Sequence, residues 1–193
     1  AAPGDAPLRT AQIAFVGPAG GVVTIKPAVL RQGKSVAFVG ADLVGEAGLA
    51  ARAVFGFGAG RESQLSRHFS PPPDLPAADK CEPFMPPGAG PSFTNHYETR
   101  LAKGARPATS SSEHDHYLWV RHRDRLASDI VALMALADMP PPAVMPMFTH
   151  FKPISTMTWM LNFMAVDAPP ADEWLLLQSR AEYAVDGYSS QDM

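Results

Sequence analysis

The sequence predicts an α+β fold built from antiparallel β-sheet and a single α-helix. Three observations lead to this prediction: short β-type segments divided by glycine turns at the start, one wholly apolar helical segment over residues 130–137, and long β-type segments after that helix. With 46% hydrophobic and 18% charged residues, the composition is that of a globular protein. A chain of 193 residues buries roughly 70% of its unfolded surface, so a substantial core is possible.

The first part of the chain is typical of an antiparallel meander. Short turns containing glycine separate four β-type segments, over residues 8–16, 22–30, 35–43 and 49–57. Apolar residues are frequent enough that one face of the sheet needs a cover. No helix is predicted in this half, so we expect the cover to be a helix upstream of Ala1 or the second half of the chain.

A proline-rich segment over residues 70–91 divides the chain. Proline cannot donate to a sheet ladder, so this segment is unsuited to a sheet interior. We therefore expect an N-terminal half over residues 1–69, incomplete at its start, then a linker over residues 70–91. The C-terminal half would cover residues 92–193, with its last strand missing. The one cysteine, Cys81, lies in the linker and excludes an internal disulfide.

The second half predicts a β-β-α-β-β-β order. We expect strands near residues 93–101 and 115–122 before the helix. After the helix, strands are expected over residues 154–166 and 174–185, and residues 188–193 resemble the start of another. One apolar helix would then be wrapped by antiparallel sheet.

Asp129 is the most informative residue, because it lies at the start of that helix. Ser128 is a good N-cap, which would put Asp129 in the first turn, where free N–H groups and the helix dipole favour a carboxylate. The helix is apolar all round and should be buried. Asp129 could therefore hold a water at the edge of a core, together with Thr156 on a nearby strand. Spacing alone favours the alternative that Asp129 is only a second capping residue.

Charge and motif patterns exclude several classes of function. A net charge of −3 without a basic stripe argues against nucleic acid as a partner. No apolar run approaches the roughly 20 residues of a membrane helix, and no secretory signal is seen, so we expect no membrane association and a cytoplasmic location. His114 and His116 have no suitably spaced third ligand, which predicts exposure to solvent rather than metal binding. No G-x-S-x-G motif supports a serine hydrolase.

A set of half-motifs, taken together in order, resembles the acyl-CoA thioesterase II type of double-hotdog protein. These motifs extend over nearly the whole chain: Phe15-Val-Gly-Pro-Ala19, Val29-Leu-Arg-Gln-Gly-Lys-Ser35 leading to Ala50-Ala-Arg-Ala53, Tyr117-Leu-Trp-Val-Arg121, Ala127-Ser-Asp129, Trp174-Leu-Leu-Leu-Gln178 and Asp186-Gly-Tyr-Ser-Ser190. The resemblance implies two hotdog halves, each an antiparallel sheet wrapped around a central helix. The helix of the first half would then be missing from this chain.

The resemblance also implies a catalytic set and no metal or organic cofactor. Members use an Asp at the start of the second helix, a Ser or Thr on the next strand and a Gln on the last strand to orient a water. Asp129 and Thr156 match the first two positions. The Gln would follow Met193, so Gln191 is not assigned to that role.

This chain departs from the family pattern after Thr156. Better-studied members continue with an Asp-His pair, whereas this chain has Thr158-Trp159, which makes the site more apolar. Thr158, two residues along the strand, could substitute for Thr156. Met157 and nearby methionines suit either an acyl-chain pocket or an irregular core.

The predicted function is hydrolysis of fatty acyl-CoA to free acid and CoA. Asp129 and Thr156 would hold the water, and backbone N–H groups near Ser128 and Ile130 would receive the oxyanion. The alternative is a non-catalytic acyl-CoA or lipid-binding hotdog protein. A hotdog hydratase is less consistent, because no His flanks the helix start. The substrate partner would be acyl-CoA, and the resemblance makes a homo-oligomer of double-hotdog subunits the expected assembly.

Overall fold

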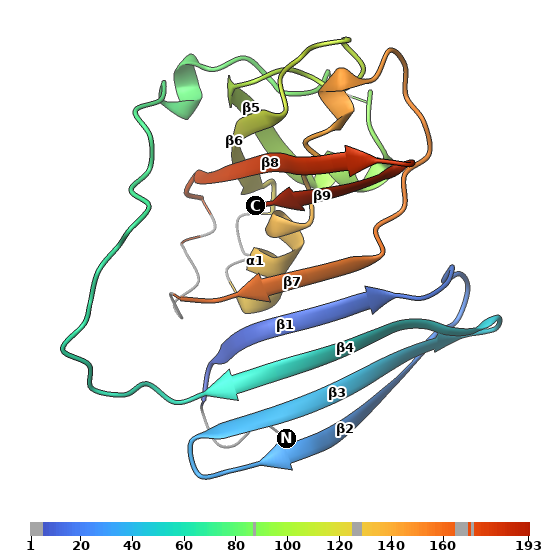
Figure 1. The fold of residues 1–193 in the computed structure, drawn as a ribbon, viewed down its shortest axis with the longest axis vertical. Helices are drawn as coiled ribbons and strands as arrows, with labels where there is room; N and C mark the ends of the chain where they lie inside the picture. The colour runs from blue at the N-terminus through green and yellow to red at the C-terminus, as the bar shows by residue number, and fades with distance from the viewer. Residues whose placement is uncertain (1–5, 87, 125–128, 165–169, 171) are drawn as a thin grey trace. The chain divides into compact units, whose positions relative to one another are not determined.

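The computed structural model describes residues 6–86, 88–124, 129–164, 170 and 172–193. Within this part of the chain it contains β-strands, one α-helix and short 3-10 helices (Figure 1). The chain forms two compact units. Unit 1 comprises Ala1–Arg67 and Ile154–Asp167, and unit 2 comprises His68–Pro153 and Ala168–Met193.

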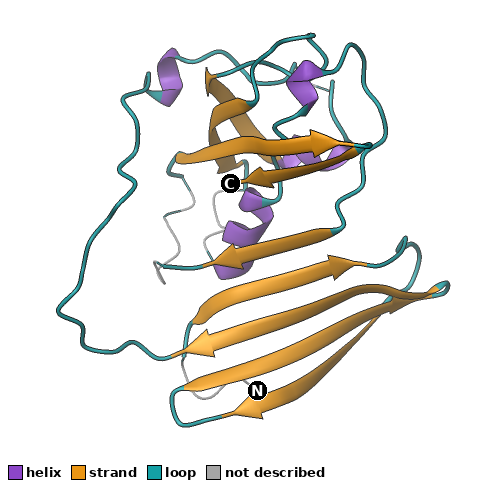
Figure 2. Cartoon of the chain, in the orientation of Figure 1, coloured by secondary structure: helices purple, strands orange, loops and turns teal. Residues whose placement is uncertain are grey.

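Unit 1 is an antiparallel sheet of five strands in the order β2-β3-β4-β1-β7 (Figure 2). The first four strands follow one another through short turns, as the glycine pattern predicted. Gly48, which starts β4, has a φ of +106°, a conformation that glycine adopts without strain. The strands are β1 (Leu8–Phe15), β2 (Thr24–Gln32), β3 (Val36–Gly45), β4 (Gly48–Gly58) and β7 (Thr158–Asn162).

The buried strand positions of unit 1 are filled mainly by small side chains. Ala11, Ala37 and Ala50 are almost fully buried. In contrast, every residue of β2 is exposed, including Ile25 at 65%. The described residues of this unit contain no α-helix. Its sheet therefore lacks a packed helical layer of its own.

The predicted strand over residues 154–166 is wrong at its start. β7 begins only at Thr158, where it pairs with Ala14 of β1. One more backbone bond follows, from the N–H of Phe15 to the carbonyl of Met157 (2.9 Å). Beyond Phe15 the partner strand ends, so residues 154–156 have no ladder to join. Residues 165 and 166 lie outside the described part.

Unit 2 contains a second antiparallel sheet, in the order β5-β6-β8-β9, and the helix α1 (Ile130–Ala137). Asp186 and Gly187 connect β8 to β9 with φ values of +51° and +82°, the conformation of a type I′ hairpin turn. Helix α1 covers the apolar segment over residues 130–137, begins one residue after the start implied by a Ser128 cap, and packs against β6. The strands are β5 (Tyr97–Lys103), β6 (Asp115–His122), β8 (Leu175–Val185) and β9 (Tyr188–Asp192).

The strand predicted over residues 93–101 begins later than expected. Ser92–His96 form a 3-10 helix, and β5 starts at Tyr97. The physical reason is local: both the N–H and the hydroxyl of Thr94 donate to the carbonyl of Pro91, at 3.0 and 2.7 Å. These bonds close a turn before the strand begins.

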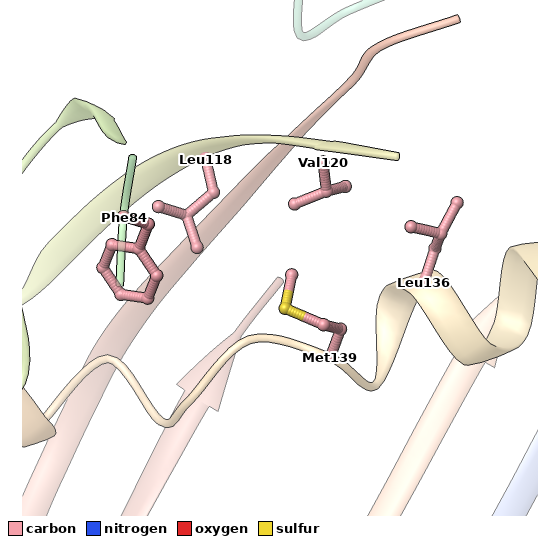
Figure 3. Packing of buried hydrophobic residues seen from close by; sticks show 5 residues of the cluster. All are labelled: Phe84, Leu118, Val120, Leu136 and Met139. Atoms are coloured by element: carbon pink, nitrogen blue, oxygen red, sulfur yellow. The ribbon is translucent and has the colours of Figure 1, made fainter. Parts of the chain in front are cut away.

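The core of unit 2 forms between the sheet and the chain segments that cover it. Leu118 and Val120 point inward from β6, Leu136 comes from α1, and Phe84 and Met139 come from loops (Figure 3). All five are nearly or fully buried. Alternation along β6 explains the pattern, because every second side chain of a strand faces the same side.

Part of the proline-rich segment is hydrogen-bonded to other residues of unit 2. Pro83 forms a β-bridge with Arg100, and the N–H of Phe84 donates to the carbonyl of Thr99 (3.1 Å). Arg106 donates to the carbonyls of Phe84 and Pro83, at 2.9 and 2.7 Å. Proline blocks its own N–H only, so neighbouring residues still pair and Phe84 still packs in the core. The division into halves at residues 70–91 stays a prediction.

The expectation that α1 is buried on all sides is wrong. Leu136 is the one buried residue among the eight of the helix, and Val131 is 67% exposed. Within unit 2 the helix has β6 as its main neighbour, so sheet covers one side. No helix among the described residues combines the length and apolarity needed to cross a bilayer.

Candidate functional site

Asp129 is itself the N-cap of α1, so the cap lies one residue after the predicted cap, Ser128. Its φ and ψ are −110° and 178°, an extended conformation, and Ile130 is the first helical residue. The Oδ1 atom of Asp129 accepts a hydrogen bond from the N–H of Ala132 at 2.8 Å. This is the capping bond to the third residue of a helix. Ser128, predicted as the cap and as an oxyanion donor, lies outside the described residues.

The capping bond uses only one of the two carboxylate oxygens of Asp129. The residue is exposed, and within the described chain Oδ2 has no hydrogen-bond partner. Ile130 is at the first helical position, where an N–H has no acceptor inside its own helix. A carboxylate oxygen and an N–H without an intrahelical acceptor therefore lie at the positive end of one helix. Such an end can hold a water and a developing anionic oxygen.

Thr156 lies in unit 1, whereas Asp129 lies in unit 2, so neither unit alone contains both. Thr156 is exposed and precedes β7 instead of lying on it, as had been expected. The argument that Thr158 shares a strand face with Thr156 therefore does not hold, because the strand begins at Thr158.

Residues 157–159 differ from one another in their surroundings. Met157 is 62% exposed. Thr158 is exposed and starts β7, while Trp159 is half-buried and lies opposite Ile13 of β1. Alternation in β7 puts Thr158 and Trp159 on opposite faces of the strand. The two side chains therefore would not both line the same wall of a pocket within unit 1.

His116 is the main residue that the sequence interpretation placed wrongly. It was predicted to be exposed with His114, but only His114 is exposed; His116 is fully buried on β6. Burial lowers the pKa of His116 to about 4, against a smaller opposing effect of Asp115. Neither ring nitrogen has a hydrogen-bond partner within the described chain. The same is true of the hydroxyl of Ser179, the residue of β8 that lies opposite His116 of β6 in the strand register. The sequence contained a signal for this burial, because residue 116 shares one face of the strand with the apolar residues 118 and 120.

The side chain of Gln191 makes a structural hydrogen bond. Its Oε1 accepts the N–H of Ala143 at 2.8 Å, which ties β9 to the loop after α1. Within the described part of the chain, no three His, Cys, Asp or Glu side chains gather as metal ligands would. The candidate site is the carboxylate of Asp129 at the helix start.

Comparison with known proteins connects these features to a family. The family model for the acyl-CoA thioesterase C-terminal domain matches residues 72–193, which include Asp129 and Thr156. No curated protein sequence matches the chain.

Solved structures similar to this chain share its fold. A conserved protein of unknown function with a hot dog fold, from Alicyclobacillus acidocaldarius, has a TM-score of 0.85 and 25% identity, covering 96% of this chain and 71% of its own. A protein from Thermobifida fusca, provisionally assigned as a thioesterase II, has a TM-score of 0.77 and 19% identity, covering 96% and 70%. An acyl-CoA thioesterase II from Mycobacterium marinum has a TM-score of 0.74 and 16% identity, covering 95% and 72%.

These matches confirm the α+β hotdog class, with two antiparallel sheets and, within the described residues, one α-helix. They also confirm the resemblance drawn from the half-motifs. Because the matched region includes well over half of the residues, the chain belongs to the acyl-CoA thioesterase C-terminal domain family.

Proposed function

We propose that this protein hydrolyses fatty acyl-CoA thioesters to free acid and CoA, with Asp129 orienting the attacking water. The observation that carries the proposal is the cap geometry of Asp129. One carboxylate oxygen holds the helix start through Ala132, and the other has no hydrogen-bond partner among the described residues of the chain, on a side chain that belongs to an exposed residue. Capping and chemistry therefore do not compete for the same atom.

The proposed reaction needs no group beyond side chains, backbone and water. Oδ2 of Asp129 accepts a proton as the water oxygen attacks the thioester carbon. The N–H of Ile130 stabilises the oxyanion that forms on the former carbonyl oxygen. The carbon–sulfur bond then breaks, and the CoA thiolate leaves and takes up a proton. Thr156 would hold the same water, and a Gln beyond Met193 would complete the set implied by the family.

A binding function without catalysis is the second candidate. Two observations favour it: the capping bond alone explains an Asp at position 129, and Trp159 is a half-buried apolar residue where family members carry polar ones. In that case acyl-CoA would bind saturably without turnover. The two candidates differ in one measurable quantity, the release of free thiol.

The test is free-thiol release from acyl-CoA thioesters of short to long chain length. Wild type is compared with Asp129→Asn and with Asp79→Asn, which changes another exposed carboxylate at the start of a short helix. We expect turnover in wild type and Asp79→Asn, and a fall in kcat of about a hundredfold or more in Asp129→Asn. Saturable binding with no turnover in wild type would instead support the binding function.

A further inference from the structure

Two side chains of the sheet in unit 2 hydrogen-bond to backbone carbonyls of α1. Nε2 of His122 lies 2.9 Å from the carbonyl oxygen of Ala132. The hydroxyl of Tyr97 donates to the carbonyl of Ala135 at 3.2 Å. A carbonyl can only accept, so Nε2 of His122 must carry the hydrogen. These bonds join the end of the sheet to the first turns of the helix.

Tyr97 and His122 form one structural feature. Tyr97 begins β5, His122 ends β6, and the two are directly opposite in the strand register. Their ring centroids are 5.0 Å apart with an interplanar angle of 47°. Partial burial raises the pKa of Tyr97, with a further contribution from the Asp138 carboxylate, so its hydroxyl remains a donor. His122 shares its face of β6 with Val120 and Leu118, the face that forms the core.

Ala132 connects this pair to Asp129. The N–H of Ala132 donates to Oδ1 of Asp129 at 2.8 Å, and its carbonyl accepts from His122 at 2.9 Å. The residue that holds the Asp129 carboxylate is therefore itself held by the sheet. Helix α1 has only eight residues, and a helix this short is marginal without tertiary contacts. Its first turn depends on such contacts for a defined position.

We propose that His122, through Ala132, and Tyr97, through Ala135, are positioning residues that hold α1 and so fix the Asp129 carboxylate at its start. The inference rests on the proposed function, because it assigns the two residues a role in turnover. Positioning matters for rate, since misplacing a catalytic group by about 1 Å can reduce the rate by on the order of a hundredfold.

The test compares His122→Leu, which removes the donor, with His122→Gln, whose amide can still donate to Ala132. Tyr97→Phe removes a single hydroxyl and serves as the least disruptive variant. We expect kcat to fall about tenfold in His122→Leu, with KM within about twofold, and to recover most of the loss in His122→Gln. Tyr97→Phe should lose about two- to fivefold in kcat, because its bond is longer.

Hydrogen exchange of the Ala132 amide provides a readout that does not depend on activity. All measurements are made well below the melting temperature of each variant. Faster exchange in His122→Leu, restored in His122→Gln and accompanied by the same pattern in kcat, supports the inference.

Unchanged kcat in folded His122→Leu, while Asp129→Asn abolishes turnover, overturns the inference and leaves the proposed function intact. If Asp129→Asn turns over like wild type, the proposed role of Asp129 in hydrolysis fails and the catalytic role of the pair fails with it. Unchanged exchange of the Ala132 amide in His122→Leu overturns the inference in either case.

Discussion

The two compact units have the same kind of sheet but different interiors. Unit 2 buries Phe84, Leu118 and Val120 with side chains from α1 and the following loop. The buried strand positions of unit 1 hold alanines and glycines, and Ile25 on its edge strand is 65% exposed. Both sheets are antiparallel, but within the described residues only unit 2 has a helix packed on its sheet. The large buried side chains on the strands therefore belong to the unit whose sheet has a helix packed on it, as expected when a second layer covers the apolar face of a sheet.

Truncating a large buried side chain in unit 2 should lower the stability of the protein more than any other change considered. Phe84→Ala should lower the free energy of unfolding by about 3–5 kcal/mol, because it opens a cavity in the core of unit 2. Urea unfolding followed by the fluorescence of Trp119 on β6 reports on that unit. A loss below about 1 kcal/mol would mean that Phe84 is not a core residue and would weaken the comparison.

Acid should act on unit 2 through His116. Its pKa in the folded protein, about 4, lies below the ordinary value of 6.5, so folding favours the neutral ring. The stabilisation is present above pH 6.5 and is lost as the pH falls from 6.5 toward 4, because the unfolded chain then takes up a proton more readily. The loss should reach at most about 3 kcal/mol.

Unfolding midpoints in urea between pH 7 and pH 4.5 measure this effect. His116→Phe keeps an aromatic ring at the position but cannot be protonated, so its pH dependence should be flatter than that of wild type. Parallel pH profiles for the two proteins would show that His116 is not the group responsible.

The smallest effect is expected in unit 1. Ile25→Thr keeps a β-branched residue on β2 and exchanges exposed apolar surface for a hydroxyl, so the free energy of unfolding should change by no more than about 0.5 kcal/mol. Trp159 on β7 gives the fluorescence probe for this unit. A loss of 2 kcal/mol or more would show that β2 is covered in solution and would remove the contrast between the units.

Features set by local chemistry were predictable from the sequence. The glycine turns located the first four strands, and the apolar segment over residues 130–137 located α1. The late start of β5 also has a local cause, the turn that Thr94 closes, but other failures depended on partners distant in the sequence. Residues 154–156 look strand-like, but β1 ends before it can pair with them. Phe84 was assigned to a linker because of its proline neighbours, although their effect is limited to their own N–H groups.

The candidate site was predictable only in part, for the same reason. Position 129 followed from helix-start chemistry, although the cap proved to be Asp129 itself. His122 and Tyr97 were not found, because their bonds to Ala132 and Ala135 join strand ends to a helix and leave no periodic signal. The burial of His116 could have been recognised from its alternation with Leu118 and Val120.

The most direct test of the account measures melting temperature and thioester turnover together in Asp129→Asn and Asp129→Ala. Asparagine caps helices about as well as aspartate, whereas alanine costs about 1 kcal/mol. We expect Asp129→Asn to melt like wild type but to lose turnover, and Asp129→Ala to lose turnover and also to melt at a lower temperature. Turnover in Asp129→Asn equal to that of wild type would contradict this expectation, because the carboxylate would then be a cap and nothing more.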